Sequence, residues 1–204
     1  LLVADLRETK LKTQVYDLHL PFSDVNLSIK VNLIREAYDA AKSYDQRITK
    51  VQSSLVDEIQ YVTIANSEGL LISDVRPQVR LTASATAEDK GVRNTGYGNA
   101  GGRIGLGFFQ NKMTPAKIGK LAGEEAITLL SAVDPPAGEQ PVVLGSFQSG
   151  VMIHEAVGHP FEADGNRKKT SIFWDKMGKQ IANSIVTIYD DPTIPNLRGS
   201  FNVD

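Results

Sequence analysis

Short strand-like runs separated by turn signals fill the middle of the chain, and they restrict its fold more than any other feature. The four strand-like runs are Val51–Val56, Ile59–Ala65, Leu70–Val75 and Val79–Ala87. Two stretches between or after them contain the residues that hairpin turns prefer, at Asn66–Gly69 and Glu88–Gly91. The pattern predicts an antiparallel meander.

Two other segments carry apolar residues at helical spacing. Val31–Tyr44 reads as an amphipathic helix, and a second helix begins at Thr114-Pro115 and runs to about Ser131. Threonine is a good N-cap, and proline suits the first helical position. Further short strands are expected at Leu1–Thr13, Val15–Leu20 and Ser184–Tyr189. The predicted fold class is therefore α+β, with an antiparallel or mixed β-sheet and packed helices.

Composition and charge exclude several classes of protein. A chain of 204 residues with 41% hydrophobic content can bury a core in one or two domains. The net charge of −2 lacks the basic footprint of nucleic-acid binders, so no direct nucleic-acid role is expected. No apolar run approaches the roughly 20 residues that a membrane span needs. The opening Leu1–Arg7 is too short and too soon charged for a signal peptide. We expect a cytoplasmic protein without a membrane segment.

A proline-rich linker, Asp134–Gly138, divides the chain into an N-terminal α+β region, residues 1–133, and a second region, residues 134–204. The second region opens with Pro141–Phe147, which reads as a buried strand, and Ser149 is a plausible N-cap for the helix that follows. That helix carries the residues with the clearest chemistry.

Residues 154–159 read His-Glu-Ala-Val-Gly-His. Neutral imidazole is a good zinc donor, and an adjacent glutamate can act as general base toward a metal-bound water. The familiar zinc-protease pattern places its histidines at i and i+4, whereas here they stand at i and i+5. On a regular helix this spacing turns the second ring roughly 140° from the first instead of roughly 40°.

Two local features can bring the rings together. Pro160 disfavours the helical region at His159, and Gly158 lets the backbone deform, so the helix can end there and turn the second ring back. Alternatively, a single π-turn places i and i+5 on one face, and such turns are frequent at functional sites. The remaining alternative is two unrelated histidines. The sequence favours a metal site at His154 and His159, with Glu155 as the base.

The segments around this run resemble the TldD/PmbA family, whose members were once called modulators of DNA gyrase. Eight segments carry the resemblance: Asp74–Pro77, Gly96–Gly107, Ala137–Leu144, Gly150–Asp164, Asn166-Arg167, Thr170-Ser171, Asp190-Asp191 and Arg198–Ser200. It covers about residues 30–204, and the H-E-x-x-x-H run is its most specific part. The TldD branch carries this run and the TldE/PmbA branch lacks it, so the chain resembles the TldD branch.

The resemblance implies a zinc metallopeptidase that hydrolyses or matures small unfolded peptides, as a heterodimer with a TldE/PmbA-type subunit or as a homodimer. It also implies that residues 134–204 begin the metallopeptidase core and that the third zinc ligand is a cysteine beyond residue 204. The sequence contains no cysteine, begins at Leu1 rather than Met, and stops soon after a turn-like segment. We therefore expect a chain truncated at both ends. The nearest substitute ligands are Glu162 and Asp164, although carboxylates in such places are usually solvated.

Two further segments are candidates for substrate binding. Gly96–Gly101 fits G-x-G-x-x-G, but the following Gly102–Phe109 reads as extended rather than helical, which disfavours a dinucleotide site. A peptide could pair with this strand near Gly101 and Gly102 by strand addition, or the glycines could serve packing or a mobile flap. Arg167 could pair with a substrate carboxylate, or belong to a solvated loop.

Two other functions remain open. The chain could be a non-catalytic partner subunit of TldE/PmbA type, which the intact His-Glu…His run disfavours. It could also be a zinc hydrolase that acts on a non-peptide substrate.

Overall fold

The structure, a computed structural model, describes residues 5–12, 14–16, 25–111, 113–146 and 149–203. The chain forms two compact units. The first consists of Leu1–Val133 together with Asp191–Asp204, and the second of Asp134–Asp190. No helix among the described residues is long and apolar enough to cross a membrane.

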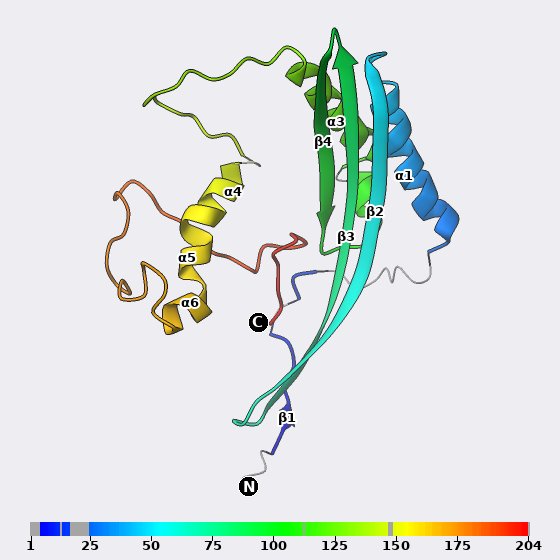
Figure 1. The fold of residues 1–204 in the computed structure, drawn as a ribbon. Helices are drawn as coiled ribbons and strands as arrows, with labels where there is room; N and C mark the ends of the chain where they lie inside the picture. Colours follow the sequence, from blue (N-terminus) through cyan, green and yellow to red (C-terminus); the bar gives the residue numbers. More distant parts are fainter. Residues whose placement is uncertain (1–4, 13, 17–24, 112, 147–148, 204) are drawn as a thin grey trace. The chain divides into compact units, whose positions relative to one another are not determined.

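The first unit contains an open, mixed four-stranded sheet (Figure 1). Its long strands are β2 (Ile48–Ala65), β3 (Leu70–Asp89) and β4 (Val92–Gly102). β3 is antiparallel to β2 along its whole length and to β4 along its second half. The short β1 (Arg7–Glu8) runs parallel to the beginning of β3. The predicted α+β class and the antiparallel meander are confirmed.

The hairpin turns lie where the sequence predicts them. The Asn66 side chain accepts hydrogen bonds from the backbone N–H groups of Glu68 and Leu70, and Gly69 has a φ of +93°. Lys90 and Gly91 both have positive φ, at 49° and 83°, which is the combination that a two-residue type I′ turn requires.

The strands are longer than predicted, because pairs of predicted runs merge into β2 and into β3. The interruption expected near Pro77 is absent. β4 reaches β3 only from Val79 onward, so between Ile72 and Gln78 the described strands pair with β3 on one side alone. A proline is tolerated at an open strand edge because no ladder hydrogen bond is lost there.

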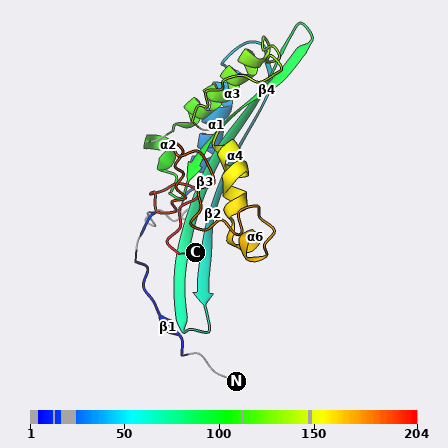
Figure 2. The ribbon, with the colours of Figure 1, turned by 90° about the vertical axis from the view of Figure 1, so that its left-hand side faces the viewer.

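Two helices cover one face of the sheet (Figures 1 and 2). α1 (Leu27–Lys42) begins at the N-cap Asn26, whose side chain accepts from the Ser28 N–H. α3 (Pro115–Leu129) begins, as predicted, at Thr114, which accepts from the Lys117 N–H. The extended conformation predicted for Gly102–Phe109 is wrong from Arg103 onward, since turns lead there into the short helix α2 (Phe108–Asn111).

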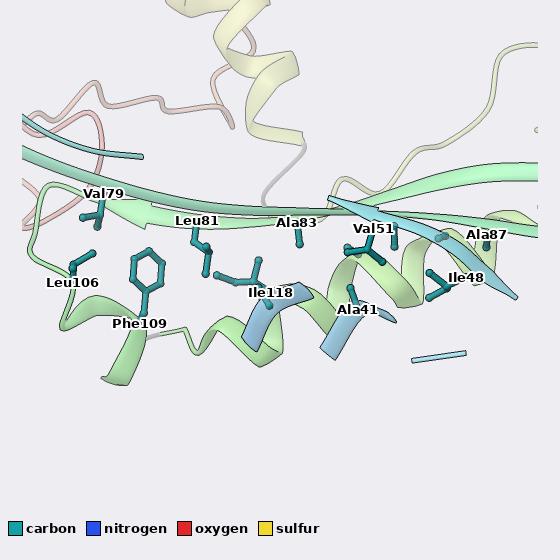
Figure 3. Close-up of a cluster of buried hydrophobic side chains, with 14 residues drawn as sticks. Ala41, Ile48, Val51, Val79, Leu81, Ala83, Ala87, Leu106, Phe109 and Ile118 are labelled. Atoms are coloured by element: carbon teal, nitrogen blue, oxygen red, sulfur yellow. The ribbon is translucent and has the colours of Figure 1, made fainter. Parts of the chain in front are cut away.

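The core lies between this sheet face and the helices (Figure 3). Leu81 of β3 and Ile118 of α3 are fully buried, and the buried Phe109 ring belongs to the same cluster. β4 packs closely against α3 at two glycines, Gly96 and Gly98, which have no side chain. A Cβ on Gly98 would lie 2.0 Å from the Ile118 carbonyl oxygen, and one on Gly96 would lie 2.3 Å from the Ala126 nitrogen. Glycine at these two positions therefore permits close helix–strand packing.

The N-terminal strand predictions are largely wrong where the structure tests them. Within residues 5–12, the part of the predicted Leu1–Thr13 strand that the structure describes, only Arg7–Glu8 forms a strand, because only these residues pair with β3. Val15 and Tyr16 are buried without forming a strand, and the rest of Val15–Leu20 lies outside the described residues.

The second unit contains a run of short helices (Figure 1): α4 (Ser149–Ile153), the π-turn η2 (His154–Gly158), α5 (His159–Phe161) and α6 (Ala163–Arg167). The strands predicted at Pro141–Phe147 and Ser184–Tyr189 are absent from the residues described there. A strand needs a hydrogen-bonded partner, and the described part of this unit supplies none. Val143 and Ile185 accordingly remain 97% and 88% exposed. The motif helix therefore does not follow a buried strand.

Within the first unit, a buried polar cluster joins the last residues of the chain to β3. The Asp74 carboxylate, 2% exposed, accepts hydrogen bonds from the Tyr16 hydroxyl, from Arg76 Nε at 2.9 Å and from Asn202 Nδ2 at 2.9 Å. The guanidinium of Arg76 lies 4.6 Å from the centre of the Phe201 ring, a cation–π contact. Ionised Asp74 is thus compensated by three donors and one positive charge.

This cluster predicts an acid-sensitive contribution to stability. Burial alone would raise the pKa of Asp74, but the hydrogen bonds from Tyr16, Asn202 and Arg76 outweigh it and lower that pKa. The stabilisation is therefore complete above the unfolded-state pKa of about 3.9 and is lost as the pH falls through the lower folded-state value. Asp74→Asn should cost about 3 kcal/mol at neutral pH, since it leaves the Arg76 guanidinium, whose side chain is only 11% exposed, without its partner charge.

Hydrogen exchange of the β3 amides around Asp74 measures this effect locally. The exposed Asp5→Asn serves as the control and should leave the exchange unchanged. Equal protection in Asp74→Asn and wild type at pH 7 would show that the carboxylate charge contributes nothing.

Candidate metal centre

A π-turn brings the two motif histidines together. The His159 N–H donates to the His154 carbonyl, so the backbone hydrogen bond closes over five residues rather than four. His159 keeps a helical backbone (φ −56°, ψ −44°) although Pro160 follows, and the helix continues through Phe161. The π-turn explanation is confirmed, and the alternative in which the helix ends at His159 is wrong.

The resulting cluster has the dimensions of a metal site. Ligand atoms of His154, Glu155 and His159 lie within 4.8 Å of one another, and the two ring centroids are 4.3 Å apart. Glu155 Oε2 lies 3.7 Å from His159 Nε2. The histidines are therefore not unrelated. Two imidazole nitrogens beside one carboxylate form a donor set that suits zinc or a similar divalent ion.

Gly158 leaves room for the first ring of this cluster. A Cβ at Gly158 would lie 3.3 Å from His154 Nδ1, which is closer than ordinary van der Waals contact. The glycine therefore allows the π-turn to form with the His154 side chain folded against it.

A second carboxylate holds the other histidine. His159 Nδ1 and Glu162 Oε1 are 2.7 Å apart, and the two residues are separated by one helical turn. The hydrogen bond and negative charge of Glu162, with a smaller effect of Glu155, raise the pKa of His159. Asp164, the other carboxylate considered from the sequence, pairs instead with Lys168 Nζ at 3.1 Å.

The loop after the motif folds back on it through hydrogen bonds to backbone carbonyls. Asn166 Nδ2 donates to the Pro160 and Glu162 oxygens, each at 2.9 Å. Ser171 Oγ donates to the Pro160 oxygen at 2.5 Å. The Phe161 ring stacks on another ring, that of Phe173, at 4.8 Å. Asn166 and Ser171 downstream of the motif therefore hold the following segment against its backbone, a role that the turn-forming composition alone did not predict.

The three candidate substrate residues belong to different units: Gly101 and Gly102 to the first, and Arg167 to the second. A Cβ on Gly101 would lie 2.1 Å from the Val79 oxygen, and one on Gly102 would lie 2.4 Å from the Asn196 oxygen, so both glycines serve packing in the first unit. Arg167, at the end of α6 in the second unit, is exposed. Their part in substrate binding stays a prediction.

Comparisons with known proteins show which domains and chains this sequence is similar to. The PmbA/TldA metallopeptidase central domain matches residues 20–130, and the C-terminal domain of the same metallopeptidases matches residues 137–204. A metalloprotease TldD homolog from Haemophilus influenzae is 40% identical over 90% of this chain and 39% of its own length. A metalloprotease from Methanothermobacter thermautotrophicus is 37% identical over 90% of this chain and 40% of its own length.

Solved structures share the fold. A protein from Bacteroides thetaiotaomicron, described as a modulator of DNA gyrase, has a TM-score of 0.77 and 20% identity over 94% of this chain and 42% of its own. A protein of the same description from Thermotoga maritima has a TM-score of 0.69 and 24% identity, over 84% of this chain and 38% of its own. The chain spans about two fifths of the length of the curated relatives it matches. On the match of both domains, the chain belongs to the PmbA/TldD family of metallopeptidases.

Proposed function

We propose that the protein is a zinc-dependent metallopeptidase of the TldD type that hydrolyses or matures small unfolded peptides. The observation that carries the proposal is the π-turn, which gathers His154, Glu155 and His159 within 4.8 Å. A chain that served only as a non-catalytic partner would have no need of this cluster.

His154 and His159 would hold the metal, which when bound polarises a carbonyl and lowers the pKa of its water toward neutrality. The Glu155 carboxylate stands beside both rings, and 63% of its side chain is exposed, so it is accessible to water and substrate. As general base, Glu155 takes the proton from the attacking water, and as general acid it delivers that proton to the leaving amine.

Two histidines leave a catalytic zinc site one protein ligand short of the usual three. We propose that the third is a cysteine outside these 204 residues, in keeping with the family resemblance and with the absence of cysteine here. A TldE/PmbA-type subunit or a second copy of the chain is the proposed partner, and the cytoplasm the proposed location. We propose no direct contact with nucleic acid, because the net charge is −2.

Substrate would enter in extended form. Strand addition at the edge of β4 near Gly101 and Gly102 recognises backbone rather than side chains, which suits varied unfolded peptides. In the middle of that edge, the Tyr97 N–H already donates a hydrogen bond to Glu125 Oε2 at 2.5 Å and so is not available to a peptide. Arg167 would pair with a substrate carboxylate in a bidentate manner.

The test compares one small protein in folded and destabilised forms as substrates of the full-length enzyme. We expect rapid, chelator-sensitive cleavage of the destabilised form, restored by zinc, and resistance of the folded form, because its backbone is already paired. Substrate form is varied rather than Gly101, since a side chain at Gly101 would disturb the pairing with β3 itself. Equal rates on both forms would contradict entry as an extended strand.

A further inference from the structure

We propose that Glu162 is a positioning residue that fixes the ring of His159 so that its Nε2 faces the metal, an inference that rests on the proposed function of this site. Glu162 Oε1 lies 2.7 Å from His159 Nδ1. The other ring nitrogen, Nε2, is the one that lies 3.7 Å from Glu155 Oε2. The Glu162 and Glu155 carboxylates therefore lie at different nitrogens of the His159 ring.

This division has a chemical consequence. A neutral imidazole carries one N–H, and a carboxylate at Nδ1 favours the tautomer in which Nδ1 is the donor. Nε2, the nitrogen on the side of Glu155, then carries the free lone pair. Histidines that bind metals commonly donate their second nitrogen in this way, which fixes the ring and raises its basicity as a ligand.

Hydrogen bonds on both sides of Glu162 fix its backbone. Its N–H donates to the His159 oxygen at 3.1 Å, and its own oxygen accepts from the Asn166 N–H at 3.2 Å and from Asn166 Nδ2 at 2.9 Å. Glu162 thus ends α5 and begins α6. These bonds fix the backbone from which the Glu162 carboxylate reaches His159 Nδ1.

A direct role as metal ligand fits the geometry less well. Glu162 Oε1 is already engaged with His159 Nδ1, whereas Glu155 lies at the other ring nitrogen, Nε2. Among the described residues, the group whose ligand atoms converge consists of His154, Glu155 and His159, without Glu162. Orientation of the second histidine is the role that the contacts assign.

The experiment compares Glu162→Ala and Glu162→Gln in the full-length protein, with Asp164→Asn as the matched control. Zinc affinity is measured by competition with a chelator. Glu162→Ala should weaken zinc binding about 10- to 100-fold while a saturating concentration still loads one ion per chain. Glu162→Gln keeps an oxygen acceptor for the Nδ1–H and should lose less. Asp164→Asn should bind zinc as wild type does, because Asp164 contacts Lys168 instead.

A second readout needs neither metal nor activity. Nitrogen-15 resonances of the His159 ring in metal-free protein should show mainly the Nδ1–H tautomer in wild type and a mixture in Glu162→Ala. Unchanged affinity and unchanged tautomer in Glu162→Ala would overturn the inference. Loss of stoichiometric zinc from both Glu162 variants would overturn it in favour of a direct ligand. If wild type cleaves no peptide yet Glu162→Ala shifts affinity and tautomer as stated, the proposed function fails and the positioning role stands.

Discussion

Replacing Glu155 with glutamine should lower the rate of peptide cleavage by about 10²- to 10⁴-fold, the range that general acid–base catalysis contributes. Glutamine has nearly the same shape as glutamate but cannot accept a proton at neutral pH. His154 and His159, the two proposed ligands within this chain, are unchanged, so zinc should remain bound at the wild-type amount.

The measurement pairs cleavage of an unfolded peptide with zinc content of the same preparation, both on full-length protein. Glu139→Gln makes the same substitution at an exposed carboxylate outside the motif and should behave as wild type. A Glu155→Gln protein that lost its zinc, yet cleaved normally for each ion still bound, would show Glu155 to be a ligand rather than a base.

The meander and the start of α3 could be predicted because their causes are local, whereas α1 begins at Leu27, four residues before the predicted Val31. Lys90-Gly91 supplies the two positive φ values of a tight hairpin, and Thr114-Pro115 supplies a cap and a suitable first residue. Strand length was less predictable. Pro77 reads as an interruption in sequence, and only the sheet topology shows that it lies where one edge of β3 is open.

The metal site was partly predictable. The residue types at positions 154, 155 and 159 indicated the chemistry, but the spacing left the local geometry undecided between two backbone conformations. The preference of a pre-proline residue for extended conformations is modest. At His159 it is overcome by the helix, which continues through the π-turn into α5. The contact of Glu162 with His159 follows from their i, i+3 spacing once that helix is known.

Long-range contacts carried no local signal. Tyr16 and Asn202 reach Asp74 across 58 and 128 residues of sequence, and nothing near Asp74 indicates either partner. The strands predicted in the second unit are absent from its described residues for a similar reason, since strand pairing also depends on residues distant in the sequence. Apolar runs such as Val142–Leu144 favour a strand, but a strand forms only beside a partner.

We propose that the π-turn makes His154 and His159 ligands of one zinc ion. Zinc content of the purified full-length protein, determined by elemental analysis after dialysis, tests it most directly. His19→Ala, which removes the third histidine of the sequence, is the control. Wild type and His19→Ala should contain about one zinc per chain, because three protein ligands and one water complete a catalytic site.

His154→Ala and His159→Ala should each contain almost no zinc, since either change leaves the ion with too few protein ligands. The two variants should also lose cleavage together, and added zinc should not restore it at concentrations that reload the dialysed wild type. Stoichiometric zinc retained by either variant would contradict a site shared by these two histidines.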